Sequence, residues 1–307
     1  MQNVFFSSDG MNIEYIESGK GARMLLLFDC QGSEQERNTI FGILETSFHV
    51  FAPNRRDWVY GGINGEYYSV YQECFELIEF MEENKIQNIF GQGVGAVIAM
   101  HLALRYPVKK MVLFETYLTR FMNLNWLPKY NRQMQKGDYF GAGVTFLKCT
   151  GEIKWFIPSA VLKLFIWFLF HVSIFPVNKE EQLEVKIIRY EDTRINKIWT
   201  KNVNERKRMN FIRELKQICL PIMAAVQSEA ELDGLAGVAT EALILCHCGS
   251  KGYVFKSADY LTKHISGSRK IIVNLTGEHK GGTDSAGYPD FLKSITEFIN
   301  KEGIKNV

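Results

Sequence analysis

The stretch 89–96, with the sequence IFGQGVGA, places three glycines between an apolar run and a helix-like segment. Gly91, Gly93 and Ala96 fit the pattern G-x-G-x-x-A, in which glycines let a pyrophosphate approach the first turn of a helix. Glu115 ends the next apolar run, where an acidic side chain would hold a ribose hydroxyl. At least three predicted strands precede the turn, however, and nothing after it completes a second nucleotide-binding half. Nucleotide binding is therefore kept as an alternative.

Buried strands are predicted on both sides of this turn. Continuous apolar runs indicate central strands, and alternation of apolar and polar residues at 11–18 indicates a strand with one solvated face. Segments with apolar residues at helical spacing lie between the runs. The pattern is typical of a mainly parallel sheet flanked by helices, so we expect an α/β fold. The runs are 23–28, 49–53, 88–90, 110–115, 241–246 and 269–275.

The alternation of strand and helix stops after residue 116 and resumes near residue 237. Residues 117–236 are rich in Trp and Phe and mostly helical in period. We therefore expect a core made of 1–116 and 237–307, with 117–236 inserted as a helical cap or lid. The most apolar stretch, 160–170, is too short to span a bilayer, and we expect a buried or pocket-lining helix there.

Composition limits the function classes. Apolar residues make up 46% of the chain and charged residues 23%, which is ordinary for a globular protein. The formal net charge of +2 gives no argument for a nucleic-acid partner. The first ten residues have no signal-peptide pattern, and the 6 cysteines have no disulfide-framework spacing. These features predict a cytoplasmic protein with reduced thiols.

The order of elements resembles the capped branch of the α/β-hydrolase superfamily over nearly all of 1–116 and 240–302. The family's nucleophile elbow reads G-x-S-x-G, and residues 91–95, GQGVG, match it except at the central position. Small residues flank the nucleophile because the turn crowds the strand against the helix. Residues 277–279, Gly-Glu-His, followed by a helix near Pro289, resemble the family's histidine loop and closing helix.

This resemblance implies where chemistry would occur. Gly93 stands at the nucleophile position, which is vacant whether the glycine is native or was introduced in place of serine to trap a complex. His279 is the triad member in its usual place, and Glu115 is a candidate for the acid that orients it. The resemblance further implies an oxyanion- or ligand-binding role for Val94, Asp29, Cys30 and Gly32. We also expect that a serine at position 93 would fit sterically.

Three cysteines are candidates for metal binding or nucleophilic chemistry. Cys30, Cys246 and Cys248 would lie toward the carboxyl edge of the sheet, with His247 between the last two. A C-x-C pair lacks the paired spacing of a zinc motif, so we expect no metal and buried, inert thiols. A nucleophilic Cys30 is a minor alternative.

Two classes of function follow. The first hypothesis is a pseudo-hydrolase that binds a small, mostly apolar molecule, with no cofactor, no nucleic-acid partner and no spanning membrane segment. The alternative is a hydrolase or lyase that uses His279 with Glu115, or a displaced nucleophile. The residue at position 93 distinguishes ordinary serine hydrolysis, which needs a serine there, from both of these hypotheses.

Overall fold

The computed structural model describes most of the chain. The described residues are 2–8, 10, 12–29, 34–54, 69–149, 156–171, 228–275 and 288–301, with 211, 212, 215, 222, 225 and 226 in addition. They divide into two compact units, one formed by Met1–Met122 with Gln217–Val307 and the other by Asn123–Lys216. Each unit has its own packing and is described separately.

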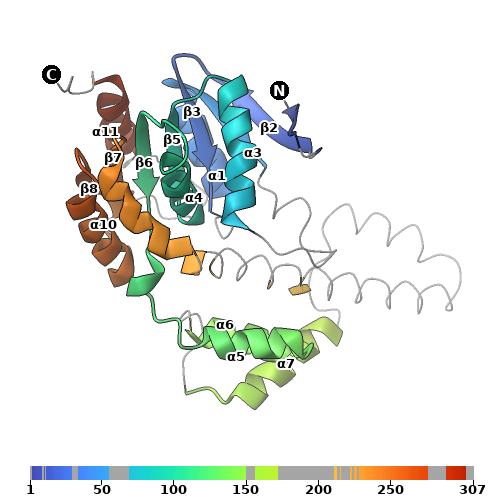
Figure 1. Cartoon of the computed structure of the whole chain (residues 1–307). Coiled ribbons are helices and arrows are strands. Elements are labelled where there is room, and N and C mark those ends of the chain that lie inside the picture. The colour runs from blue at the N-terminus through green and yellow to red at the C-terminus, as the bar shows by residue number, and fades with distance from the viewer. Residues whose placement is uncertain are drawn as a thin grey trace, which may run out of the picture. The chain divides into compact units, whose positions relative to one another are not determined.

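The first unit is built on one sheet, in which the described residues contribute eight strands (Figure 1). The strand order is β1-β2-β4-β3-β5-β6-β7-β8. β1 with β2, and β2 with β4, pair antiparallel, whereas every other pair is parallel. The strands are β1 (Gln2–Phe6), β2 (Asn12–Ser18), β3 (Ala22–Leu27), β4 (Phe48–Pro53), β5 (Asn88–Gln92), β6 (Lys110–Phe114), β7 (Glu241–His247) and β8 (Arg269–Val273).

The mainly parallel sheet expected from the buried runs is confirmed. β1 is an addition that the apolar pattern did not indicate. It is an edge strand whose Val4 and Phe6 side chains are exposed, and it is held by pairing with β2 and by Phe5, which is buried in the first core.

Two hydrophobic cores cover the two faces of the sheet. Side chains alternate between faces along a strand, so Leu25 and Leu27 of β3 enter one core while Met24 and Leu26 enter the other. This two-sided burial explains the continuous apolar runs. The first core is closed by α3 (Val70–Glu83), α4 (Val94–Ala103) and α10 (Gly252–His264), and the second by α1 (Glu34–Leu44) and α11 (Tyr288–Asn300).

The second unit contains three described helices, α5 (Leu127–Gln135), α6 (Tyr139–Cys149) and α7 (Ser159–His171). Its boundaries lie at 122/123 and 216/217, whereas we expected the inserted region to be 117–236. The short helices η1 (Thr119–Phe121) and η2 (Glu229–Gly237) explain the difference. Leu118, Leu232 and Leu235 in and beside them belong to the first core of the sheet unit.

Helix α7 was expected to be buried or to line a pocket, and burial is contradicted for most of its described side chains. Only Leu162 and Ile166 are buried among its described side chains, where they pack with Val144 of α6. Several large apolar side chains of α7 are exposed. In the described part of the chain, no helix has the length and apolarity needed to cross a membrane.

Candidate functional site

The turn between β5 and α4 has a backbone conformation at Gly93 that favours glycine. Its φ is 56° and its ψ is −118°, a region that side-chain-bearing residues rarely adopt. The N–H of Gly93 donates to the carbonyl oxygen of Phe114 in β6 at 3.0 Å, and the carbonyl oxygen of Gly93 accepts from Ala96 at 3.1 Å. The strand, the turn and the helix are therefore fixed to one another at position 93.

Gly91 and Gly95 are required by close backbone approach. A Cβ atom at Gly91 would lie 2.6 Å from Cα of Ala96, and one at Gly95 would lie 2.0 Å from the carbonyl oxygen of Leu27. Both distances are far inside van der Waals contact with backbone atoms that have no freedom to move aside. Glycine at these two positions thus lets α4 pack directly against β3 and β5.

The space beside Gly93 is filled by Asp29, which follows β3. A Cβ atom at position 93 would lie 2.0 Å from Oδ2 of Asp29 and 2.5 Å from its Cγ. A serine at position 93 would therefore fit only if the Asp29 side chain moved aside, because its carboxylate occupies the volume that the serine side chain needs. The carboxylate also lies near the N-terminus of α4, where a helix favours negative charge.

Glu115 also has an unusual backbone conformation, with a φ of 51°. Its N–H donates to the carbonyl oxygen of Leu245 in β7 at 3.0 Å. Its Oε1 accepts from the N–H of His247 at 2.6 Å and lies 2.5 Å from the hydroxyl of Ser250. Positive φ at a residue other than glycine stores strain, and such strain is concentrated at functional sites. Glu115 thus joins the end of β6 to the loop after β7.

Sequence reasoning did not identify His247 and Ser250 as the partners of Glu115. The available signal was their position, since β6 and β7 are adjacent parallel strands in which Phe114 lies opposite Leu245. The carboxyl ends of both strands consequently meet at one edge of the sheet. The hydroxyl of Ser250 is also 2.7 Å from the carbonyl oxygen of His247, so its single proton serves one acceptor at a time.

Tyr253, in the first turn of α10, was not predicted either. Burial raises the pKa of its phenol, and the negative charges of Asp29 and Glu115 raise it further. The phenol therefore stays protonated as a hydrogen-bond donor at this edge. Its ring lies 6.3 Å from that of Tyr117, in an edge-to-face arrangement.

The cysteines near β7 differ from one another. Burial, followed by the charge of Glu115, raises the pKa of Cys246 to about 12, so this thiol is inert, as expected. Cys248 is exposed, which corrects the expectation that it is buried, because the chain leaves the sheet after His247. Among the described residues, no group of three His, Cys, Asp or Glu side chains could hold a metal.

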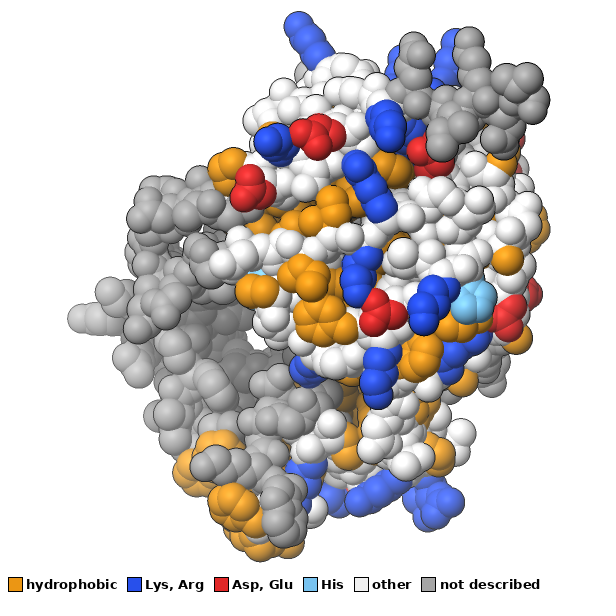
Figure 2. Space-filling model, turned by 90° about the vertical axis from the view of Figure 1, so that its left-hand side faces the viewer, with side chains coloured by type: hydrophobic (Ala, Val, Ile, Leu, Met, Phe, Trp, Pro, Cys, Tyr) orange, Lys and Arg blue, Asp and Glu red, His pale blue; other side chains and the backbone are white. Residues whose placement is uncertain are grey.

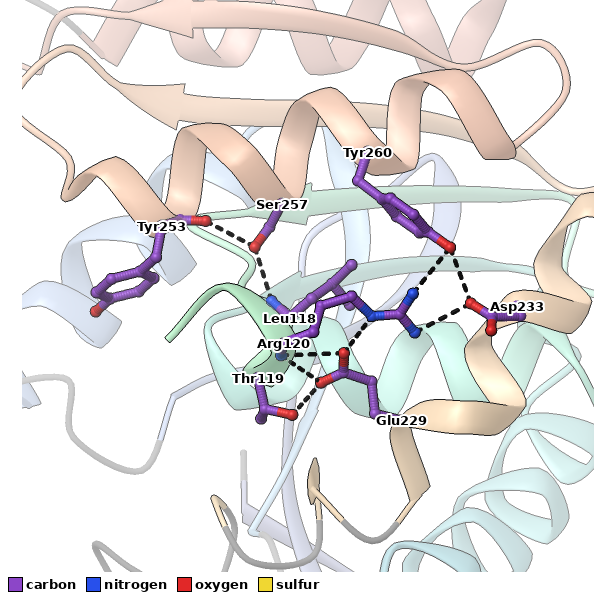
Figure 3. Close-up of polar contacts among 8 residues, drawn as sticks. All are labelled: Leu118, Thr119, Arg120, Glu229, Asp233, Tyr253, Ser257 and Tyr260. Carbon is purple, nitrogen blue, oxygen red and sulfur yellow. Dashed lines mark hydrogen bonds and ion pairs between the residues drawn. The ribbon is translucent and has the colours of Figure 1, made fainter. Parts of the chain in front are cut away.

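A polar network joins the two segments through which the chain leaves and re-enters the sheet unit (Figure 3). The buried carboxylate of Glu229 accepts from the hydroxyl of Thr119 and from Nε of Arg120 at 2.5 Å. The Arg120 guanidinium also donates to Asp233 and to the hydroxyl of Tyr260, each at 3.0 Å. Figure 3 shows the ring of Tyr253, on the same helix as Tyr260, turned away from this network.

His279, Cys30 and Gly32 lie outside the described residues. The structure brings together Asp29, Glu115 and the pair Gly93–Val94 from three segments that are distant in sequence. The pairing of Glu115 with His279 and the role of Cys30 stay predictions.

Comparisons with known proteins address the fold. No protein-family model and no curated protein matches the sequence. Solved structures match over nearly the whole chain. An α/β hydrolase from Sphaerobacter thermophilus has a TM-score of 0.62 at 14% identity, covering 97% of this chain and 100% of that one. An esterase from Exiguobacterium antarcticum has a TM-score of 0.57 at 16% identity, covering 97% and 98%.

An enol-lactonase from Burkholderia xenovorans is also similar, with a TM-score of 0.53 at 14% identity over 97% of this chain and 99% of that chain. Identities this low establish the shared architecture alone. The eight-stranded, mainly parallel sheet with flanking helices matches these structures. The chain therefore has the α/β-hydrolase fold.

Proposed function

We propose that this chain is a pseudo-hydrolase that binds a small, mostly apolar molecule at the carboxyl edge of its sheet. The observation that carries the proposal is the pair formed by Gly93 and Asp29. Serine hydrolysis needs a nucleophile at the elbow and donors that stabilise a developing oxyanion. Gly93 has no side chain, and the carboxylate of Asp29 lies where that side chain would begin.

The charge of Asp29 acts against oxyanion chemistry in a second way. The backbone N–H of Val94, in the first turn of α4, is the donor expected to stabilise an oxyanion. A carboxylate already near that helix terminus repels further negative charge, and the repulsion is stronger in a site shielded from water. Hydrolytic activity is thus lowered in two independent ways. The nucleophile is missing, and an anion occupies its place.

The dinucleotide alternative meets the same obstacle. A pyrophosphate would have to approach the N-terminus of α4 beside the carboxylate of Asp29. Glu115, which that hypothesis assigns to a ribose hydroxyl, instead accepts from His247 and Ser250. Neither the anion site nor the ribose contact is supported.

Tyr117 and Tyr253 support the binding of a molecule with apolar surface. Their rings meet edge to face, and the phenol of Tyr253, which is close enough to feel the charges of Asp29 and Glu115, supplies a donor that orients a bound polar group. An aromatic surface with few polar groups is typical of small-molecule sites.

One observation favours the enzyme alternative as well. Glu115 keeps a strained backbone, and its Oε2 accepts no hydrogen bond from the described residues. That oxygen would be available to orient the imidazole of His279 as a general base. On this alternative a substrate or water is activated directly, without an acyl-enzyme at position 93.

The test combines turnover with binding, using p-nitrophenyl butyrate and a fluorophosphonate probe. We expect no hydrolysis above the buffer rate, no labelling by the probe, and binding of the ester detected by saturation-transfer NMR. Tyr253→Ala should weaken that binding, whereas Lys256→Ala, on the exposed side of the same helix, should not. Turnover that disappears in Glu115→Gln and in His279→Ala would establish the enzyme alternative. Phosphonylation of the unmodified chain at another residue would reveal a displaced nucleophile.

A further inference from the structure

Helix α7 exposes an apolar face where a solvated helix carries charged side chains. Its buried seam consists of Leu162 and Ile166 alone among the described side chains. The opposite faces carry large apolar side chains that are between 43% and 66% exposed, namely Val161, Leu164, Phe165, Trp167 and Phe168. Lys163 forms an ion pair with Asp138, which lies between α5 and α6, at 2.6 Å. Surface helices of globular proteins have the reverse pattern.

The unit that contains α7 is strongly basic, although the whole chain is nearly neutral. Residues 123–216 have 17 Lys and Arg against 9 Asp and Glu, whereas the rest of the chain has 19 against 25. Within the described parts of this unit, Asp138 is the sole acidic residue. The basic ones there are Lys129, Arg132, Lys136, Lys148 and Lys163. Figure 2 shows one face of the protein, on which hydrophobic, basic and acidic side chains are exposed.

A cavity of about 500 Å³ lies beside the first residue of α7. It contains two lysines, with amide, hydroxyl and aromatic groups around them, and all of its lining belongs to the second unit. Ammonium groups and neutral donors are the groups that bind phosphate oxygens. The lining residues are Asn123, Asn125, Trp126, Lys129, Thr145, Lys148, Cys149 and Ser159.

We propose that the exposed face of α7 and this lysine-lined cavity form a docking surface for an anionic lipid bilayer. The apolar side chains of α7 enter the boundary between headgroups and acyl chains, and the cavity receives the phosphate of a headgroup. Trp and Phe are favoured at that depth, and neighbouring lysines add attraction to anionic lipids. With 13 residues, α7 is about 20 Å long at about 1.5 Å per residue, so it lies in the plane of the interface.

Other occupants fit these observations less well. Nucleic acid would use the lysines but would leave Leu164 and Val161 in water. A second copy of the chain would bring two units with the same excess of positive charge together, which is unfavourable. An anionic bilayer satisfies both the apolar face and the charge.

The experiment is co-sedimentation of the full chain with vesicles of phosphatidylcholine alone and of phosphatidylcholine mixed with phosphatidylglycerol. We expect binding to the mixed vesicles that weakens as salt is added, and little binding to phosphatidylcholine. Leu164→Glu should lower the partition coefficient at least about tenfold, since it removes an inserted apolar side chain and adds a negative charge. Lys129→Gln with Lys148→Gln should also reduce binding to the mixed vesicles.

Phe75→Glu is the matched control, because Phe75 of α3 is 64% exposed and Leu164 is 66% exposed. It should leave vesicle binding unchanged, and circular dichroism should show that all variants are folded. Absence of vesicle binding, equal binding to both vesicle types, or an equal loss in Phe75→Glu would overturn the proposal. A dimer that Leu164→Glu dissociates, or RNA binding without vesicle binding, would assign the surface to another partner and overturn it too.

Discussion

Replacing Gly93 by serine tests the geometry of the elbow directly. A serine at φ 56° carries backbone strain of about 1–3 kcal/mol. Its Cβ would also lie 2.0 Å from Oδ2 of Asp29, so the carboxylate must leave its place near the N-terminus of α4. Moving the carboxylate adds about 0.5–3 kcal/mol, the range of coupling between residues in direct contact. We expect Gly93→Ser to destabilise the protein by about 1.5–6 kcal/mol in total.

A double-mutant cycle separates strain from collision. Asp29→Ala removes the carboxylate, so Gly93→Ser in that background should lose only the strain. The coupling between the two substitutions should be about 1–3 kcal/mol in favour of the double variant, measured by urea denaturation. Gly137→Ser is the control for strain alone, because Gly137 has a φ of 70° and a Cβ there would meet only Tyr139 Cε2 at 4.0 Å. Additive losses for positions 29 and 93, within about 0.5 kcal/mol, would refute the reasoning.

Two further predictions concern the sheet unit. Burial, followed by the charge of Arg105, lowers the pKa of His101 from 6.5 to about 4, so the unfolded chain binds more protons than the folded one between those values. The free energy of unfolding should therefore fall as the pH decreases from 6.5 toward 4, by about 3 kcal/mol at pH 4. Urea titrations at successive pH values provide the measurement. His101→Gln should make the free energy of unfolding depend less on pH in this range. For the network around Glu229, Arg120→Ala should destabilise the protein by about 1–3 kcal/mol, because it leaves the buried carboxylate with fewer donors. Glu229→Gln combined with Arg120→Ala should lose less than the sum of the two single losses, and a double-mutant cycle in urea provides the check.

The sequence by itself determined the sheet and its direction. Runs such as MLLLF at 24–28 are apolar at every position because both faces of the strand are buried, and that pattern is visible without coordinates. The glycines at 91, 93 and 95 likewise indicated a tight turn before a helix, since only glycine permits such close backbone approach. Local pattern was sufficient wherever burial or backbone conformation dictates residue type.

Only the tertiary structure decided what stands at the elbow. Asp29 follows one strand and Gly93 follows another, and no spacing in the sequence states that a carboxylate enters the space of a missing side chain. The partners of Glu115 and the rise in the pKa of Tyr253 have the same origin, because adjacent parallel strands bring distant segments to one edge. The exposed face of α7 was misjudged for a related reason. The apolar sequence of a helix predicts burial, but the number of buried faces depends on how many neighbours pack against the helix. Among the described residues, one side of α7 is packed, through Leu162 and Ile166.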